Sequence, residues 1–225
     1  MKIYISGIDG LMSLDGLELV TPARKKQIEK YVRLEDKARS LAAGLLMRHV
    51  CGVTDDAQIF YGKDCKPYTK NMKFNISHSG DYVALAVAES EVGVDIEKIR
   101  GYSEKVAARC FTADELEWMG RRGTCESFFR LWTAKESLMK ALGLGLKLAP
   151  KSFSALPLDS TPRQIGGKTW SLSSHLHDGH VISSAVECPC PAAKHIEAGA
   201  ATEYLPERVD YLEISPAELL RTPNS

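Results

Sequence analysis

Two acidic side chains lie two residues apart in the segment Val92–Glu97, and this spacing could serve metal chemistry. The segment reads VGVDIE, an alternation that favours a β-strand. Alternate side chains of a strand point to opposite faces, so Asp95 and Glu97 would share one face. Their backbones would be about 6.6 Å apart, which lets both carboxylates reach one Mg²⁺. The alternative is an exposed strand whose outer face is simply acidic.

A third carboxylate lies in the segment Trp132–Lys140, which has the residue types of a helix. At about 3.6 residues per turn, Trp132, Glu136 and Lys140 would form one stripe. If Glu136 faced the acidic strand, three carboxylates would repel one another unless a cation or protons compensated them, which favours a metal. Otherwise Glu136 and Lys140 form a surface pair worth about 0.3–0.5 kcal/mol on a core helix.

Small polar residues gather in the segment Asn75–Gly80, and they could bind phosphate. Hydroxyls, backbone N–H groups and imidazole all suit phosphate oxygens, which makes Ser77 and His78 candidates. A serine-rich turn with an incidental histidine is the alternative. Basic residues would add positive charge, unless they form only a solvated helix face. These residues are Arg24, Lys25, Lys26, Arg39, Arg48, Lys63 and Lys66.

Strands and helices must hold these groups in place. Thr21 and Pro22 form a helix-start signature, with a capping hydroxyl followed by a residue that needs no N–H partner. Helical periodicity continues to His49, either as one bent helix or as a helical hairpin with a break near residues 34–36. The other expected elements are strands at 2–6, 73–76, 82–88, 92–96, 169–174 and 181–187 and helices at 100–110, 114–121 and 127–142.

The chain contains a weak internal echo. Segments 74–87 and 170–186 can be aligned with a short gap, and each reads as a hairpin that follows helical segments. Two related halves with a site at their junction would explain the echo, and chance similarity is the alternative. Such halves would let a monomer complete the site. Residues from Pro189 onward are rich in proline and alanine, so we expect a peripheral tail.

The composition limits the possible partners. The chain has 225 residues, and Lys plus Arg equals Asp plus Glu at 29 each, so any phosphate site needs local basic residues. A large basic excess would mark a general nucleic-acid binder, and this chain has none. No stretch approaches the roughly 20 apolar residues of a membrane span, and the N-terminus lacks the core of a signal peptide. We therefore expect a cytoplasmic protein with free thiols, without nucleic acid or membrane as partner.

Several of these segments together resemble one enzyme family. Gly93–Glu97 followed by Leu131–Ser137 resembles the paired signature of 4'-phosphopantetheinyl transferases. The segments Phe74–Ser79, Cys65–Pro67 and Glu35–Arg39 resemble the Sfp-type branch of that family. The resemblance covers roughly residues 20 to 155 in consistent order.

The resemblance implies an α+β fold of two similar α/β halves, related by a pseudo-twofold axis, with the active site at their interface. Residues 1–98 would form the N-terminal half with the nucleotide and phosphate contacts. Residues 99–190 would form the C-terminal half with the catalytic helix and the carrier-docking surface. Residues 191–225 would be the tail.

The resemblance also implies the roles of individual residues. Asp95, Glu97 and Glu136 would hold Mg²⁺, and His78 and Arg39 would bind the 3'-phosphate of coenzyme A. The full set of implied coenzyme A contacts is Arg39, Lys66, Pro67, Ser77, His78, Asp95 and Lys140. The match is poorer in the N-terminal basic helix, where Arg24 stands at an often basic position but Gln27 replaces a second one.

The implied reaction moves 4'-phosphopantetheine from coenzyme A to a serine of an apo acyl- or peptidyl-carrier protein and releases adenosine 3',5'-bisphosphate. Glu136, directly or through a metal-bound water, would take the serine proton, and Lys140 would supply a fixed positive charge. The carrier would dock on apolar residues of segment 102–123, which otherwise fill the protein's own core. These residues are Phe111, Leu116, Trp118 and Met119.

Three other functions remain open at this level. A magnesium-dependent phosphohydrolase or nuclease could use the same carboxylates to activate water. A nucleotide-binding or carrier-docking module without catalysis could keep the same binding residues. A zinc site is a further hypothesis, with an unligated surface cluster as its alternative. Its candidate ligands are His175, His177, His180, Cys188, Cys190 and His195.

Overall fold

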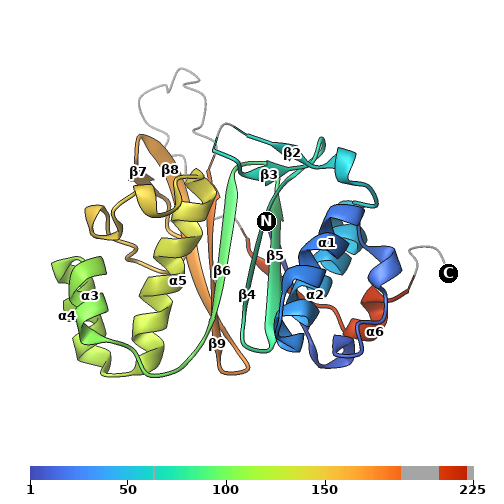
Figure 1. The fold of residues 1–225 in the computed structure, drawn as a ribbon. Helices are drawn as coiled ribbons and strands as arrows, with labels where there is room; N and C mark the ends of the chain where they lie inside the picture. The colour runs from blue at the N-terminus through green and yellow to red at the C-terminus, as the bar shows by residue number, and fades with distance from the viewer. Residues whose placement is uncertain (63, 189–207, 222–225) are drawn as a thin grey trace, which may run out of the picture.

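The computed structural model describes residues 1–62, 64–188 and 208–221, and it has four layers. Two β-sheets pack against each other, and helices cover the outer face of each sheet (Figure 1). The first sheet has the order β10 (Asp210–Glu213), β1 (Lys2–Gly7), β5 (Tyr82–Ala88), β4 (Lys73–Ser79), β3 (Pro67–Tyr68) and β2 (Phe60–Tyr61). The second sheet has the order β6 (Val92–Lys98), β9 (His180–Glu187), β8 (Lys168–His177) and β7 (Arg163–Ile165).

The helices divide between the two sheets. The first sheet is covered by α1 (Pro22–Lys30), α2 (Leu34–Cys51) and α6 (Pro216–Leu219). On the second sheet lie α3 (Glu104–Cys110), α4 (Ala113–Arg122) and α5 (Cys125–Leu142), of which α5 packs directly on the strands (Figure 1). No helix in the described part of the chain is both long and apolar enough to cross a bilayer.

The two halves share one connectivity. In the first half, β1 leads through α2 to the β4–β5 hairpin, and β5 lies between β1 and β4. In the second half, β6 leads through α5 to the β8–β9 hairpin, and β9 lies between β6 and β8. All of these pairings are antiparallel. The expected α+β fold of two similar halves is therefore confirmed, and the two hairpins of the sequence echo occupy matching places.

The halves meet through an apolar layer. Ile3 and Ile5 of β1 pack with Val94 and Ile96 of β6, and all four side chains are buried. Val94 and Ile96 thus point toward the first sheet, as the strand alternation predicts. The intervening Asp95 must point the other way, toward α5.

Local sequence signals fix the helix ends. The Thr21 hydroxyl accepts a hydrogen bond from the Arg24 backbone N–H at 3.4 Å and begins α1. The expected hairpin of helices is present, and its break lies at residues 31–33, just before the predicted position. Gly143 ends α5 in the left-handed conformation, with φ of 71°.

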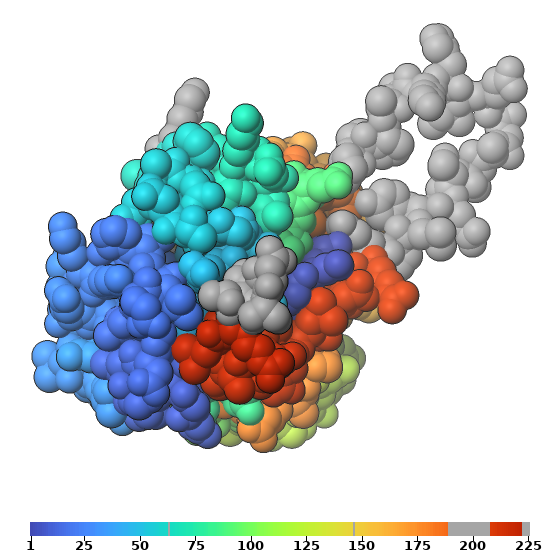
Figure 2. Space-filling model, turned by 90° about the vertical axis from the view of Figure 1, so that its right-hand side faces the viewer, coloured from blue at the N-terminus to red at the C-terminus, as the bar shows by residue number. Residues whose placement is uncertain are grey.

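Two elements fall outside the expected organisation. β6 precedes the predicted boundary at residue 98 but pairs with β9 in the second sheet. The expectation of a peripheral tail is wrong for residues 208–221. β10 pairs in parallel with β1, and Leu219 of α6 is buried in the apolar core between α2 and the first sheet. Figure 2 shows this red segment lying against the blue N-terminal part. Apolar residues such as Ile214 and Leu219 drive this packing.

Candidate active site

The site begins where β6 and α5 touch. A β-carbon on Gly93 would lie 1.9 Å from the Ser137 carbonyl oxygen, so only glycine allows this backbone contact. The close approach brings Lys140 of α5 to Asp95 of β6, and the Lys140 ammonium donates to Asp95 Oδ1 at 2.6 Å. Ser77 of β4 donates to the same oxygen at 2.8 Å. Elements of both halves therefore converge on Asp95.

Asp95 is buried away from solvent, which is unfavourable for a charged carboxylate. Its side chain is buried, and its Oδ2 atom has no hydrogen-bond partner. Burial raises the pKa of Asp95, while the Lys140 charge and the hydrogen bonds from Lys140 and Ser77 oppose this rise. A buried carboxylate oxygen without a partner is costly, so a ligand that reaches Oδ2 would stabilise the site.

Glu136 faces the same region from α5. Partial burial raises the pKa of Glu136 first, and the negative charge of Asp95 raises it further. Glu97 adds a smaller repulsion, and Lys140 opposes it. The Glu136 carboxylate makes no hydrogen bond or ion pair with any other described residue. The third carboxylate thus lies close enough to the acidic strand to feel its charge.

Glu97 has partners of its own. The Ser79 hydroxyl donates to Glu97 Oε2 at 2.7 Å, and Arg100 pairs with the same oxygen at 3.2 Å. Within the part of the chain that is described, no three His, Cys, Asp or Glu side chains are gathered as a ready-made metal cage. The donor set nevertheless suits a hard cation, because carboxylate oxygens are the ligands that Mg²⁺ prefers and Asp95 Oδ2 has no other partner.

A cavity of about 350 Å³ adjoins this region in the N-terminal half. Its walls include Arg24, Ser40, Tyr61, Pro67 and His78. The Ser40 hydroxyl is buried without a hydrogen-bond partner, and Arg24 forms no ion pair with any described residue. Burial lowers the pKa of Arg24. An anionic ligand would compensate both groups.

Arg39 and His78 are two further basic residues near the cavity, and His78 lines it. Arg39 pairs with Asp36 at 2.5 Å and donates to the Gly80 carbonyl at 2.6 Å. His78 is exposed at the surface, but partial desolvation by its neighbours lowers its pKa, and the charges of Arg39 and Lys140 lower it further. The two cations therefore lie near His78, and together they create a positive potential between the cavity and the carboxylates.

Comparison with known proteins gives the family. The model of the 4'-phosphopantetheinyl transferase superfamily matches residues 91–185, and the model of 4'-phosphopantetheinyl transferase, N-terminal, matches residues 14–90. The chain is 33% identical over 169 residues to 4'-phosphopantetheinyl transferase Sfp of Bacillus subtilis (strain 168), a match that covers 68% of this chain and 75% of that protein. The chain belongs to the 4'-phosphopantetheinyl transferases.

A second curated relative agrees with this assignment. The 4'-phosphopantetheinyl transferase gsp of Aneurinibacillus migulanus is 34% identical over 145 residues, which cover 60% of this chain and 60% of that protein. Among solved structures, holo-[acyl-carrier-protein] synthase of Thermotoga maritima matches with a TM-score of 0.32 and 22% identity, over 44% of this chain and 62% of that chain.

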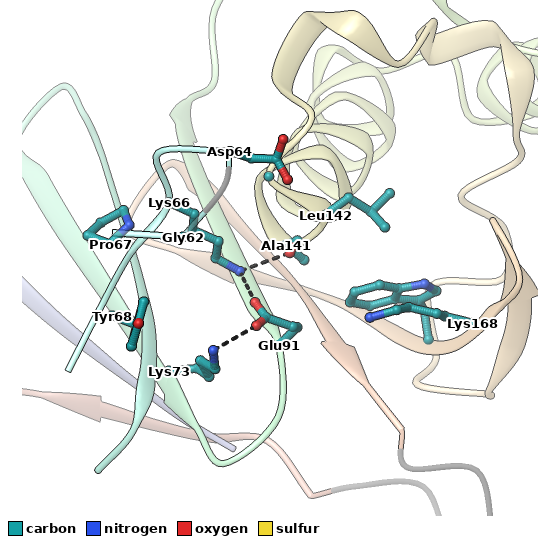
Figure 3. A pocket seen from close by; sticks show the side chains of 12 residues that line it. Gly62, Asp64, Lys66, Pro67, Tyr68, Lys73, Glu91, Ala141, Leu142 and Lys168 are labelled. Carbon is teal, nitrogen blue, oxygen red and sulfur yellow. Dashed lines mark hydrogen bonds and ion pairs between the residues drawn. The ribbon is translucent and has the colours of Figure 1, made fainter. Parts of the chain in front are cut away.

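Lys66 of this transferase does not point a free ammonium group at a ligand. Its Nζ atom donates to Glu91 Oε2 at 2.8 Å and to the carbonyl oxygens of Val92 and Ala141 at 2.9 Å each. Figure 3 shows Lys66 reaching from the loop before β3 toward Glu91 and Ala141. An ammonium group has three N–H donors, and all three are used here. The predicted contact between Lys66 and coenzyme A stays a prediction.

The sequence patterns missed three polar residues of the transferase. Asn75 accepts a hydrogen bond from the Val94 backbone N–H at 2.9 Å and links β4 to β6. Glu115 and Lys135 form a buried ion pair at 2.9 Å next to the catalytic helix stripe. Asn75 and Lys135 lie within two of the sequence motifs described above, so they could have been proposed as structural residues. The neighbouring sequence does not indicate which residues they contact.

The zinc hypothesis does not survive for its described members. His180 begins β9 and Cys188 follows its end, so the extended strand separates them by about 26 Å. His177 and His180 instead pack edge-on against Tyr82. Cys190 and His195 lie outside the described residues.

The expected docking residues divide into two groups. Phe111 and Met119 are buried in the core that α3, α4 and α5 share, as the core alternative stated. Leu116 and Trp118 are only partly buried, and the Arg122 guanidinium stacks over the Trp118 ring at 3.9 Å. Only the second pair remains accessible to a partner.

Proposed function

We propose that this chain transfers the 4'-phosphopantetheine arm of coenzyme A to a serine hydroxyl of an apo acyl- or peptidyl-carrier protein. Adenosine 3',5'-bisphosphate leaves, and the serine oxygen forms a new bond to the phosphorus of the arm. The observation that supports this reaction most directly is the meeting of Ser77, Asp95 and Lys140 at the junction of the halves, with Glu136 beside them.

Asp95, Glu97 and Glu136 would hold Mg²⁺ in this reaction. The open Asp95 Oδ2 and the unpaired Glu136 carboxylate support the assignment. When bound, the ion would neutralise negative charge on the diphosphate oxygens. Lys140, Ser77 and the Glu97 partners Ser79 and Arg100 then remain to orient the carboxylates.

The protein's own groups carry the remaining tasks. Lys140 lies one helical turn beyond Glu136, and its ammonium donates to Ser77, Val94 and Asp95. It would therefore act through space, as a fixed positive charge near the leaving phosphate and not as a hydrogen-bond donor to it. Glu136, one helical turn before Lys140, would accept the proton of the attacking serine hydroxyl directly or through a water. Positioning the hydroxyl in line with the leaving oxygen supplies much of the rate gain.

The nucleotide end of coenzyme A would occupy the cavity beside α1 and α2. Arg24 and Ser40 supply an unpaired cation and an unpaired hydroxyl there, and Pro67 and Tyr61 provide apolar walls. The 3'-phosphate would lie near His78 and Arg39, whose positive surroundings favour an anion.

The acceptor carrier protein would dock on the exposed parts of Leu116 and Trp118, beside the junction-forming helix α5. One chain contributes both halves of the site, which supports action as a monomer. A cytoplasmic location is part of the same proposal, because coenzyme A is the donor.

The test mixes the protein with coenzyme A, Mg²⁺ and several apo-carrier proteins, and then records intact masses. We expect one phosphopantetheine unit on a carrier, and the rates rank the acceptors. Free phosphopantetheine without carrier modification would point instead to the hydrolase alternative. Tight coenzyme A binding without turnover would point to a module that only binds.

A further inference from the structure

Lys66 connects three segments that are far apart in the sequence. Its stem comes from the loop that precedes β3, and this loop is closed by a hydrogen bond from the Gly62 N–H to the Lys66 carbonyl at 3.0 Å. Its ammonium reaches Val92, the first residue of β6, and Ala141 in the last turn of α5. Only 14% of the side chain is exposed. The loop thus bridges the N-terminal half to both catalytic elements of the other half.

The contact with Ala141 has a specific physical basis. The last four carbonyl groups of a helix lack intrahelical partners and carry partial negative charge. In α5, the N–H groups of Gly143 and Leu144 satisfy the carbonyls of Lys140 and Met139. The carbonyls of Ala141 and Leu142 are left, and Lys66 supplies the Ala141 carbonyl with both the missing donor and a favourable charge.

The contact also lies next to the catalytic groups. Ala141 follows Lys140, and Val92 lies three residues before Asp95 on the same strand. Between these contact points, Gly93 touches the Ser137 backbone. Lys66 holds the start of β6 and the end of α5 at a fixed distance. Because closely packed elements move together, this also fixes the distance between Asp95 on β6 and Lys140 on α5.

Glu91 completes the arrangement from the turn between β5 and β6. Its Oε2 atom pairs with Lys66 at 2.8 Å, and its Oε1 atom pairs with Lys73 at 3.0 Å (Figure 3). Lys73 is the more exposed of the two lysines and has no hydrogen bond to the backbone of α5 or β6. Replacing Lys73 is therefore a matched control. It removes one lysine partner of Glu91 but leaves the contacts of Lys66 with α5 and β6 in place.

We propose that Lys66 is a positioning residue, which clamps the end of α5 to the start of β6 and thereby sets the geometry of Asp95, Glu136 and Lys140. The inference rests on the proposed function of these three residues. It differs from a coenzyme A contact, because the ammonium spends its donors on protein acceptors.

The test compares Lys66→Met, Glu91→Gln and Lys73→Met with the wild type. The measurements are kcat, KM for coenzyme A, thermal unfolding, and the affinity for Mn²⁺ as a paramagnetic probe of the carboxylate site. In Lys66→Met we expect kcat and Mn²⁺ affinity to fall by about 10–100-fold, the usual cost of losing a supporting group around a metal site. KM for coenzyme A should change little. Glu91→Gln should shift the same quantities in the same direction, and Lys73→Met should resemble the wild type.

Other outcomes overturn the proposal. A raised KM for coenzyme A with unchanged kcat in Lys66→Met would make Lys66 a substrate contact. Wild-type behaviour of Lys66→Met would remove any role. If Lys66→Met does not fold, Glu91→Gln decides, because it keeps the shape of the side chain, and wild-type values for it would end the proposal. A wild-type protein that neither binds Mn²⁺ nor modifies a carrier would instead refute the proposed function itself.

Discussion

Gly93 on β6 and Ser137 on α5 approach so closely that a methyl group on Gly93 would lie 1.9 Å from the Ser137 carbonyl oxygen and 2.6 Å from the Ala141 nitrogen. Both neighbours are backbone atoms, which cannot rotate away. The spacing of β6 and α5 therefore depends on the absence of a side chain at Gly93.

Replacing Gly93 with alanine should push α5 away from β6. We expect Gly93→Ala to cost about 1–3 kcal/mol of unfolding free energy or more, as overpacking does. Transfer should fall at least about 100-fold, because a misplacement of about 1 Å has that effect. Urea unfolding and intact-mass rates measure both.

Gly120→Ala is the matched control for this substitution. Gly120 lies within α4, and a β-carbon there would meet open space. Alanine at this position should therefore leave the free energy of unfolding unchanged or raise it by about 0.5–1 kcal/mol. Equal behaviour of the two variants would show that the close approach is not maintained in solution.

Glu136→Gln should abolish transfer while coenzyme A binding survives in weakened form. The amide keeps the shape of the side chain but cannot accept the serine proton, a role worth roughly 10²–10⁴-fold in rate. Calorimetry gives the binding constant and intact mass gives the rate. Glu117→Gln, an exposed glutamate paired with Arg121 on α4, is the control. Normal turnover by Glu136→Gln would exclude Glu136 from the mechanism.

Coenzyme A affinity should rise as the pH falls toward the ordinary histidine range. In the free protein the pKa of His78 is lowered by partial desolvation and by the charges of Arg39 and Lys140, so the ring is largely neutral at neutral pH. A bound phosphate favours the charged ring and raises the pKa, so binding takes up a proton and gains strength as the pH decreases. In His78→Gln this part of the pH dependence should disappear. An unchanged slope would place the phosphate elsewhere.

The buried pair of Glu115 and Lys135 should be among the most sensitive sites for stability. Lys135 also donates to the Pro150 and Phe153 carbonyls, and Glu115 accepts from the Ala155 N–H. Lys135→Met leaves Glu115 buried without its cation, at an expected cost of about 3–5 kcal/mol in unfolding free energy.

Two comparisons make this last test specific. The double variant Lys135→Met, Glu115→Gln should recover part of the loss, since no lone charge remains buried. Lys168→Met removes a lysine that is about half exposed and pairs with Glu187, and it should cost less than about 1 kcal/mol. A similar loss in Lys135→Met and Lys168→Met would contradict the burial of the pair.

The local elements were predictable because their signals are local. The capping residue Thr21 begins a helix where expected, and the helix predicted at 127–142 is observed at Cys125–Leu142. The alternation in Val92–Glu97 correctly predicted a strand, and its buried aliphatic side chains pack between the two sheets. Such patterns depend on residues only a few positions apart.

The partners of single side chains could not be predicted in the same way. Lys66 and Ala141 are 75 positions apart, and nothing in a lysine within a loop identifies a helix carbonyl as its acceptor. Lys135 belongs to the motif that contains Glu136, yet it faces a separate buried glutamate. Both contacts arise only when the second sheet and its helices pack, so tertiary structure decides them.

The parallel pairing of β10 with β1 has a consequence for synthesis on the ribosome. The first residues of the chain emerge long before residues 210–213, which cover the outer edge of β1. Until then, that edge presents unpaired backbone groups, and such edges invite association between nascent chains. β10 is made much later than β1 and covers its edge only then, so a product shortened before residue 210 would be prone to aggregate even though it contains Asp95, Glu136 and Lys140.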